Sequence, residues 1–220
     1  IRKNKEKEDL ALISCKVPCS AAAIYTQNKV KGAPLAVTKR HLANGTARAV
    51  ICNSGNANTC NANGEQVAEQ MCELAGNALG ISADDVIVCS TGVIGMPLPI
   101  EPIALHVKPL AVSLSTDGSL LAAKAIMTTD TFPKNLSVTF ELGGKQCVIG
   151  GIAKGSGMIH PNMATMLCFL TTDVCIDSEW LQKALKLVAD KTFNMISIDG
   201  DTSTNDMCAI MASGLAGNDE

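Results

Sequence analysis

The sequence has 220 residues, of which 47% are hydrophobic and 18% charged, and its formal net charge is −3 at pH 7. This composition is typical of a globular chain that buries a substantial core, and it excludes a disordered protein. Aromatic residues make up only 3%, so stacking platforms for nucleic-acid bases are not expected, and the slight negative charge offers no attraction to polyanions. No apolar run approaches the ~18 residues that a membrane-spanning helix needs. We therefore expect neither a nucleic-acid partner nor a membrane partner.

The hydrophobic pattern predicts a mixture of strands and helices. Short apolar runs predict strands, whereas spacing by three and four residues after Gln66 predicts a helix that ends at Gly80. Asp117 is a candidate N-cap, as is Asp177 or Ser178. The mixture predicts an α+β fold with an antiparallel sheet and helices packed outside it. In chain order we expect strands at 10–14, 21–25 and 47–52, a helix at 66–79, a strand at 86–89, helices at 100–114 and 118–127, strands at 136–142, 146–153 and 166–170, a helix at 180–189, a short buried segment at 196–198 and a strand at 207–212.

Ten cysteines raise the question of a metal or disulfide framework. None forms a C-x-x-C pair, and no histidine lies at zinc-finger spacing. We interpret them as small buried thiols in a reducing, cytoplasmic setting, with no metal site. A thiol-rich metal-binding module is the competing hypothesis.

The most informative stretch is the glycine-rich segment 154–167, in which Thr165 precedes an apolar run. Small residues before a threonine that opens a strand are a way to present a hydroxyl nucleophile. If the chain were cut between Ala164 and Thr165, the new α-amine would have a reference pKa of ~7.7–8 and could accept the proton of the Thr165 hydroxyl. The intact hydroxyl could itself attack the Ala164 carbonyl in an N→O acyl shift, and water would resolve the resulting ester. An ordinary threonine at a strand start is the alternative interpretation.

Two further segments could complete such a site. Thr91 and Gly92 follow a buried strand and could supply a hydroxyl and a backbone N–H to an oxyanion, although in isolation an ordinary tight turn is the preferred interpretation. Lys154 could pair with a substrate carboxylate, and Thr128 could donate a hydroxyl; Thr129 is close enough in sequence to compete with it.

Three other polar features are interpreted as structural. Segment 53–58 lacks a phosphate-binding signature and is read as a turn. Segment 199–206 does not have the spacing of an EF-hand, so we expect a hydrogen-bonded loop near the site. His160 precedes a proline and is assigned a scaffold role rather than that of a base.

A family resemblance is carried by five blocks of the sequence together: residues 53–58, 90–95, 127–131, 154–167 and 197–205. In this order they resemble the glutamate N-acetyltransferase (ornithine acetyltransferase) family of arginine biosynthesis, whose members continue beyond 220 residues. The resemblance implies sheets sandwiched between helical layers in an autoprocessed, N-terminal-nucleophile-type acyltransferase fold. It also implies that residues 1–164 belong to a first (α) subunit and residues 165–220 to the start of a second (β) subunit, forming one structural unit and assembling as a heterotetramer of two α and two β chains.

The resemblance also implies a reaction and roles for individual residues. Thr165, released by self-cleavage at Ala164–Thr165, would take the acetyl group of N2-acetylornithine and pass it to glutamate in a ping-pong cycle without a cofactor. Acetyl-CoA stays open as a second donor. An N-terminal-nucleophile aminopeptidase or amidase is the alternative enzyme, in which water resolves the acyl-enzyme. The implied oxyanion hole is Thr91 and Gly92, and the implied substrate contacts are Thr128, Lys154 and Thr165.

Overall fold

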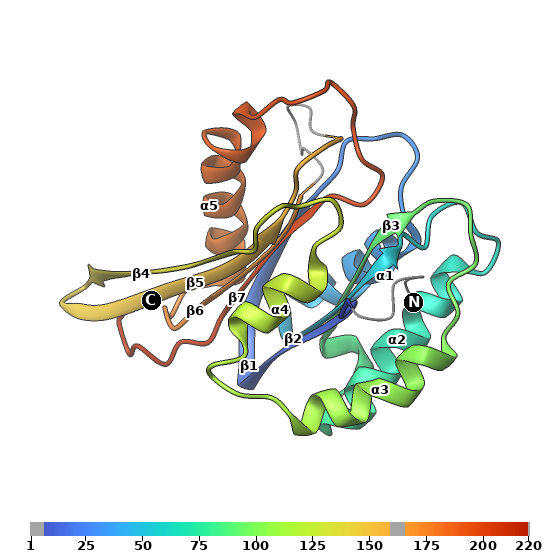
Figure 1. The fold of residues 1–220 in the computed structure, drawn as a ribbon. Helices are drawn as coiled ribbons and strands as arrows, with labels where there is room; N and C mark the ends of the chain where they lie inside the picture. Colours follow the sequence, from blue (N-terminus) through green and yellow to red (C-terminus); the bar gives the residue numbers. More distant parts are fainter. Residues whose placement is uncertain (1–6, 159–165, 220) are drawn as a thin grey trace.

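The computed structural model describes residues 7–158 and 166–219, and within them seven strands form one hydrogen-bonded sheet (Figure 1). The strand order is β3-β2-β1-β7-β6-β5-β4. Five α-helices pack against this sheet, and three short 3₁₀ turns lie at 42–44, 83–85 and 193–195. The strands are β1 (Leu10–Tyr25), β2 (Thr46–Asn56), β3 (Val86–Val93), β4 (Lys134–Leu142), β5 (Lys145–Lys154), β6 (Leu167–Thr172) and β7 (Met207–Ala212). The helices are α1 (Ala33–His41), α2 (Gly64–Leu79), α3 (Glu101–Val112), α4 (Ser119–Ile126) and α5 (Ser178–Asp190).

The strand directions are mixed, so the expected antiparallel sheet is only part of the arrangement. β2 pairs with β3 in parallel and β6 pairs with β7 in parallel, whereas the other neighbours are antiparallel. Each parallel pair is joined through a helix, α2 in the first case and α5 in the second. A helical crossover is what parallel neighbours require, because a short turn cannot bring the chain back to the same starting edge.

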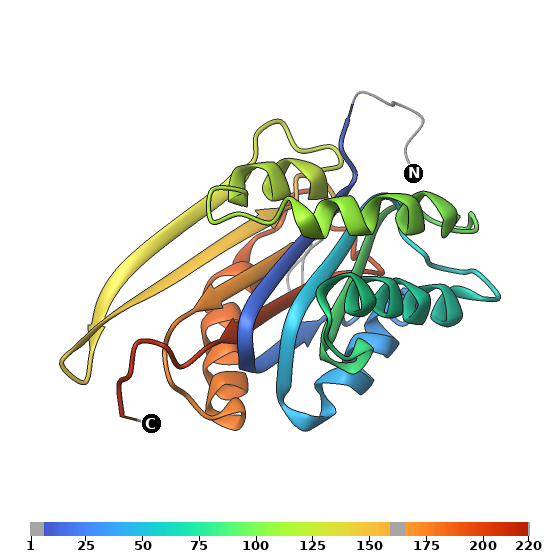
Figure 2. The ribbon, with the colours of Figure 1, turned by 90° about the horizontal axis from the view of Figure 1, so that it is seen from below.

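Strand β1 bends sharply and divides the sheet into two leaves. Its pairing with β2 is irregular between Ser14 and Cys19. The part before this bend lies beside β2, and the part from Ser20 onward pairs with β7. Both views show β1 turning back on itself at this point (Figures 1 and 2). The first leaf is therefore β3-β2 with the start of β1, and the second leaf is the end of β1 with β7-β6-β5-β4.

The core lies between the leaves and beneath the helices that cover them. Ile87 of the first leaf and Phe169 of the second belong to one buried cluster, to which α4 adds Ile126. Direct contact across the interior is given by Cys89 Sγ and Met207 Sδ, which lie 3.4 Å apart. The outer surface of the first leaf packs against α1, α2 and α3, and that of the second leaf against α5. The expected α+β fold, with sheets between helical layers, is confirmed.

Several local expectations need correction. The two strands expected at 10–14 and 21–25 are parts of the single bent strand β1, and α1 was not expected. Helix α4 begins at Ser119 after Gly118 without a side-chain cap, so Asp117 is not its N-cap. Residues 196–198 form no strand, and Ile196 and Ile198 are exposed. These errors share a cause, because local pattern does not report bends or burial that depend on distant residues.

Other expectations hold. Asp177 caps α5, accepting a hydrogen bond from the Glu179 backbone N–H at 2.7 Å. None of the ten cysteines is in a disulfide, and seven are buried as expected, whereas Cys15 and Cys175 are half-buried and Cys60 is exposed. Among the described residues, no helix is long and apolar enough to cross a membrane.

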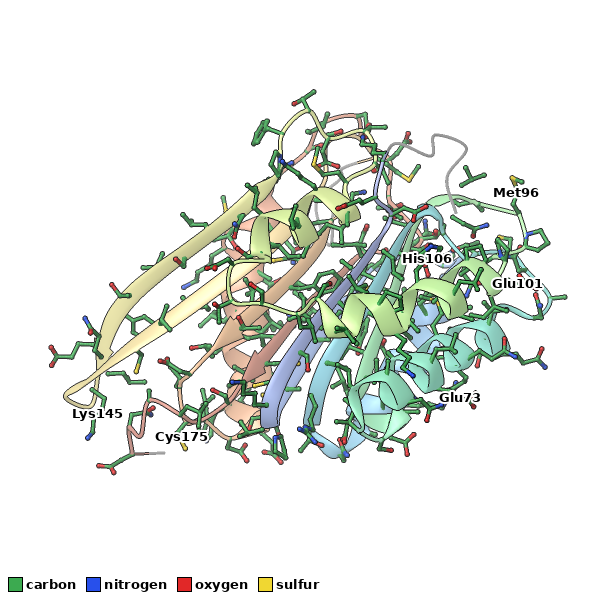
Figure 3. The ribbon with its side chains drawn as sticks, turned by 60° about the horizontal axis from the view of Figure 1, so that its bottom comes forward. Glu73, Met96, Glu101, His106, Lys145 and Cys175 are labelled. Carbon is green, nitrogen blue, oxygen red and sulfur yellow. The ribbon has the colours of Figure 1, made fainter. Side chains whose placement is uncertain are left out.

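The β4–β5 hairpin is a ribbon that extends away from the helices. Figure 3 shows Lys145 at its free end, far from Met96 and Glu101 on the opposite side of the molecule. Apolar side chains of β4 are exposed along the ribbon, among them Leu136 and Val138. β4 therefore contributes little to the core, whereas Ile152 of β5 belongs to it.

Candidate functional site

The ends of β3 and β5 meet where the two leaves come together. Thr91 of β3 and Lys154 of β5 are both buried, and Lys154 is only 2% exposed. The Lys154 Nζ atom lies 3.4 Å from Thr91 Oγ1. In strand order β2, β1, β7 and β6 separate these two strands. The bend in β1 is what brings them into contact across the interior.

The direction of the hydrogen bond between these residues matters for chemistry. An ammonium group can only donate, so Thr91 Oγ1 accepts from Lys154. The hydroxyl proton of Thr91 is then left to point toward another acceptor. A hydroxyl that accepts from a cation is also a stronger donor, since hydrogen bonds in a chain polarise one another.

Gly92, the next residue, has a backbone that no other residue would adopt without strain. Its φ is +131°, and a Cβ placed there would lie 2.3 Å from the carbonyl carbon of Gly55. The end of β3 therefore packs against β2 backbone to backbone, which only glycine permits. Such close packing holds the Thr91–Gly92 peptide in one place.

Asp130 acts on Lys154 and accepts hydrogen bonds from three donors. Its Oδ1 accepts from Lys134 Nζ at 2.7 Å and from the Gly155 backbone N–H at 2.7 Å, and its Oδ2 accepts from the Thr128 N–H at 3.2 Å. Burial raises the pKa of Asp130, but the Lys134 hydrogen bond, the two backbone N–H groups and the Lys154 charge outweigh it and hold the pKa below its usual value. This carboxylate links the Thr128 loop to the residue that follows Lys154.

Asp206 acts on Lys154 as well, and its environment is different. Its side chain is buried, and Oδ1 accepts from the Met166 backbone N–H at 3.1 Å. Oδ2 is one of two buried side-chain polar atoms that lack a hydrogen-bond partner within residues 7–158 and 166–219. Burial raises the pKa of Asp206 to about 7, and the Ser203 hydroxyl, the Met166 N–H and the Lys154 charge offset only part of the effect.

Burial also affects the lysine between these carboxylates. It lowers the pKa of Lys154, while the charges of Asp130 and Asp206 act in the opposite direction. A buried cation with two carboxylates in its surroundings is typical of a functional site, although structural ion pairs can give the same arrangement.

A network of amides fixes the loops behind Thr91. Asn205 donates to the carbonyls of Ser90 at 3.0 Å and Ala57 at 2.6 Å, and it accepts from the hydroxyls of Thr59 and Thr204. All the hydrogen-bonding capacity of the Asn205 side chain is used, which makes such a buried group rigid. The expectation of a hydrogen-bonded loop at 199–206 is confirmed.

Segment 53–58 has a structural role as expected, but it is not a turn throughout: residues 53–56 are the end of β2, and only residues 57 and 58 lie beyond the strand. Asn53 accepts from the Ser90 hydroxyl at 2.5 Å and donates to the Asn56 carbonyl at 3.0 Å. The Asn56 side chain in turn donates to the Met96 carbonyl, and Asn58 donates to the carbonyl of Gly64. These bonds connect the ends of β2 and β3 to the loops around them.

The predicted site residues fall into two groups. Thr91, Gly92 and Lys154 lie together, and Thr128 is joined to the Lys154–Gly155 segment through Asp130. Thr129 donates to or accepts from Ser156 at 2.8 Å instead. Ala164, Thr165 and His160 lie outside the described residues; the first described residue after them is Met166. The sequence pointed to the loop containing Asp206 but not to that residue, because its partner Met166 is 40 residues away.

One group of described residues could in principle bind a metal ion. The ligand atoms of His41, Glu69 and Cys72 lie within 4.8 Å of one another, on α1 and α2. His41 already contacts the Val86 carbonyl at 2.8 Å and Glu69 at 3.2 Å. Burial raises the pKa of the Cys72 thiol, which disfavours the thiolate that metal binding needs. We interpret this group as packing and hydrogen bonding between two helices.

Comparison with known proteins gives the family. The ArgJ family model matches residues 1–220. The chain belongs to the ArgJ family. A relative from Symbiobacterium thermophilum, named arginine biosynthesis bifunctional protein ArgJ, is 52% identical over 213 residues, covering 96% of this chain and 53% of that protein. The chain thus spans about half the length of the curated ArgJ relatives it matches.

Solved structures agree with this family and with the fold. An ArgJ structure from Bacillus halodurans has a TM-score of 0.68 at 42% identity, covering 73% of this chain and 85% of that one. Ornithine acetyltransferase from Mycobacterium tuberculosis, solved in complex with ornithine, has a TM-score of 0.63 at 32% identity, covering 75% and 87%. An aminopeptidase of the Ntn hydrolase fold from Ochrobactrum anthropi, at 13% identity and a TM-score of 0.51, covering 90% and 61%, shares the fold alone.

Proposed function

We propose that this ArgJ-family protein is an acetyltransferase that moves the acetyl group of N2-acetylornithine to glutamate, with Thr165 as the nucleophile after self-cleavage at Ala164–Thr165. The observation that carries the proposal is the contact between Lys154 and Thr91. This contact brings the buried Lys154 ammonium and the Thr91 hydroxyl, which come from distant strands, together beside Gly92. The proton of the Thr91 hydroxyl then remains available for another acceptor. Such a set of donors suits an acyl-transfer intermediate, which develops negative charge on oxygen.

Each step of the proposed cycle has a balanced transfer of protons. The Thr165 oxygen attacks the acetyl carbonyl while the hydroxyl proton passes to its own α-amine. The oxyanion accepts one hydrogen bond from the Thr91 hydroxyl and one from the Gly92 backbone N–H, and neither proton is transferred. Collapse of this intermediate breaks the bond to the ornithine nitrogen, which leaves with the proton held on the α-amine. The glutamate amine then attacks the ester, and the same groups act in reverse.

Self-cleavage uses the same hydroxyl in the uncut chain. The Thr165 oxygen attacks the Ala164 carbonyl, the peptide C–N bond breaks, and the nitrogen takes up a proton to become the new α-amine. Water then hydrolyses the ester. The products are two chains, which we propose stay together as one structural unit and form the heterotetramer that the family resemblance implies.

The substrate assignment rests on charge and on the relatives. N2-acetylornithine and glutamate both carry an α-carboxylate, for which the Lys154 ammonium is a suitable partner. We propose that Thr128, whose backbone N–H is bonded to Asp130, adds a hydroxyl contact. The relatives are named as arginine biosynthesis bifunctional proteins, and one solved relative contains ornithine. Acetyl-CoA as a second donor is part of the same proposal, because it would load the same hydroxyl.

The first test is the mass of the natural full-length protein under denaturing conditions, with N-terminal sequencing of each species. We expect two chains, one of which begins Thr165-Met-Leu-Cys. Incubation with acetylornithine carrying a labelled acetyl group should transfer that label to this chain, and adding glutamate should release it as acetylglutamate. Release as free acetate regardless of glutamate would instead indicate an amidase.

The matched variants are Thr165→Ala and Thr171→Ala. Thr171 is an exposed threonine on β6, so its loss should change neither cleavage nor labelling. Thr165→Ala should stay uncut and take no label. A Thr165→Ala protein that is cut at the same position or labelled at the wild-type rate would contradict the proposal.

A further inference from the structure

The bend of β1 contains a bulge, because β1 and β2 have unequal numbers of residues there. Ser14 pairs with Ala49 and Cys19 pairs with Ala47. Four residues of β1 therefore lie opposite one residue of β2. Two steps along a strand span roughly 7 Å, whereas Ser14 and Cys19 would lie roughly 17 Å apart in an extended chain. The intervening residues must therefore leave the ladder, and the two ends of the bulge are brought close together.

Two cysteines lie at the ends of this bulge. Cys15 is its first residue and is half-buried, and Cys19 is the first paired residue after it and is buried. The two thiols are hydrogen-bonded to each other. A disulfide forms only where the Cα atoms lie within about 7 Å and the side chains point toward each other. The short span of the bulge gives the first condition and the hydrogen bond gives the second, so the pair can be joined without separating β1 from β2.

Arg48, the residue of β2 opposite the bulge, adds a positive charge. Its Nη2 atom donates to the Lys16 carbonyl at 3.0 Å, and its Nε atom is buried without a hydrogen-bond partner in the described part of the chain. Burial, followed by the hydrogen bond and the charge of Cys15, raises the pKa of Cys19 to about 12, and the Arg48 charge offsets a part of this. Once the Cys15 sulfur is bonded to another sulfur, its contribution disappears and that of Arg48 stays. Cys19 is then easier to ionise.

We propose that Cys15 and Cys19 are a redox-active pair, which a small-molecule disulfide such as oxidised glutathione converts to an intrachain disulfide across the bulge of β1. The site is a modification site outside the proposed active site, and the inference does not depend on acetyl transfer. The new bond closes the bulge at the bend that brings the ends of β3 and β5 into contact.

The reaction is two successive thiol–disulfide exchanges. The Cys15 thiolate attacks one sulfur of oxidised glutathione, whose S–S bond breaks; one glutathione leaves as a thiolate and the other stays joined to Cys15. The Cys19 thiolate then attacks the Cys15 sulfur and expels the second glutathione. Two protein thiols are oxidised and one glutathione disulfide is reduced, and the protons of the two cysteines end on the two released glutathiones. Only Cys15 has to meet the oxidant, which agrees with its greater exposure.

The position of Lys16 makes the crosslink directly observable. Cleavage by trypsin after Lys7, Lys16 and Lys29 places the two cysteines in separate peptides, residues 8–16 and 17–29. The natural full-length protein is equilibrated in glutathione buffers, its remaining thiols are alkylated, and the tryptic peptides are weighed by mass spectrometry. We expect the two peptides to be joined after oxidising buffer and separate after reducing buffer.

Three variants separate the roles of the two sulfurs. Cys19→Ser should stop at the first exchange and keep glutathione on peptide 8–16. Cys15→Ser should give no crosslink and no glutathione on peptide 17–29, because Cys19 is buried. Cys60→Ser removes an exposed cysteine outside the bulge and is the matched control, which should leave the crosslink unchanged.

A comparison of folded and unfolded wild type does not depend on any variant folding. The quantity measured at half-crosslinking is the square of the reduced glutathione concentration divided by the oxidised concentration. We expect it to be at least about 10-fold higher for the native protein than in urea, because the bulge holds the two sulfurs together. Equal values in the two states would overturn the inference. So would separate peptides from native wild type in every buffer, or a Cys19→Ser protein without glutathione on Cys15.

Discussion

Asp130 and Asp206 are two carboxylates that act on the same lysine, and they differ in almost every other respect. Asp130 accepts from Lys134 and two backbone N–H groups, whereas Asp206 accepts from one backbone N–H and is also acted on by the Ser203 hydroxyl, and its Oδ2 has no partner at hydrogen-bond distance among the described residues. The pKa of Asp130 is held low, and that of Asp206 is raised to about 7. A buried carboxylate whose oxygens all accept hydrogen bonds holds neighbouring segments in place. A buried carboxylate oxygen that accepts none indicates a hydrogen-bond partner that is missing.

The largest expected effect comes from removing Lys154, the cation that acts on both Asp130 and Asp206. Lys154→Met should lower kcat/KM by roughly 100-fold, because Thr91 loses its charged donor and the substrate loses a carboxylate partner. The free energy of unfolding should also fall, by about 3 kcal/mol, since Asp130 and Asp206 both lose a compensating cation in a buried site. Steady-state kinetics and urea unfolding measure these effects. Lys145→Met, at the exposed end of the ribbon in Figure 3, is the control and should change neither.

Removing the satisfied carboxylate should affect stability more than chemistry. Asp130→Asn should lower the free energy of unfolding by roughly 1–3 kcal/mol at pH 7, because Lys134 loses its partner and two N–H groups lose a charged acceptor. The exposed Asp117→Asn is the control. An Asp130→Asn protein as stable as wild type at pH 7 would show that these three bonds contribute nothing net.

The pH dependence of stability should have opposite signs for the two acids. The folded-state pKa of Asp130 is below the unfolded value, so its contribution is present above the ordinary aspartate range and is lost as pH falls through the folded pKa. The folded-state pKa of Asp206 is above the unfolded value of ~3.9. Its ionisation therefore disfavours the folded state increasingly as pH rises from about 4 to 7. Unfolding of each Asn variant at pH 5 and pH 8 separates the two: the deficit of Asp130→Asn persists at pH 8, whereas Asp206→Asn gains relative to wild type.

The smallest expected effect comes from the hydroxyl that supports Asp206. Ser203→Ala should lower the free energy of unfolding by about 1 kcal/mol, because Ser203 Oγ also accepts from the Asn205 N–H at 3.1 Å. The pKa of Asp206 should rise further, since the Ser203 hydroxyl is one of the groups that lower it. Urea unfolding and the kcat–pH profile measure both. Ser137, an exposed serine on β4, gives the control variant Ser137→Ala. Equal effects from both variants would contradict the role of the Ser203 hydroxyl as a support of Asp206.

Local sequence pattern was sufficient for most of the elements. The spacing after Gln66 identified α2, and Asp177 was recognised as the cap of α5 because its capping bond is local. Helix α1 could not be recognised in the same way, because it has a weak apolar face and begins after Gly32, which offers no side-chain cap. Strand β1 looked like two strands because its middle is alternately exposed and includes Pro18 at the bend.

The site was less accessible to sequence reasoning. Thr91, Gly92 and Lys154 were found, but the contact between Lys154 and Thr91 spans 63 residues and depends on the bend in β1. Asp206 was one acid among several in a polar loop, and nothing local distinguished it. Its importance comes from its hydrogen bond with Met166, the residue before β6, which forms only in the folded chain.

The exposed edge of the β4–β5 ribbon affects how the chain behaves in solution. β4 is the last strand in the sheet order, so the backbone N–H and C=O groups on its outer side have no strand beside them in the described part of the chain. The side chains of Leu136, Val138 and Phe140 are exposed on the same strand. An open edge of this kind is a template on which a second polypeptide can add a strand. Residues 1–220 handled by themselves should therefore self-associate along β4, and their apparent stability should depend on protein concentration.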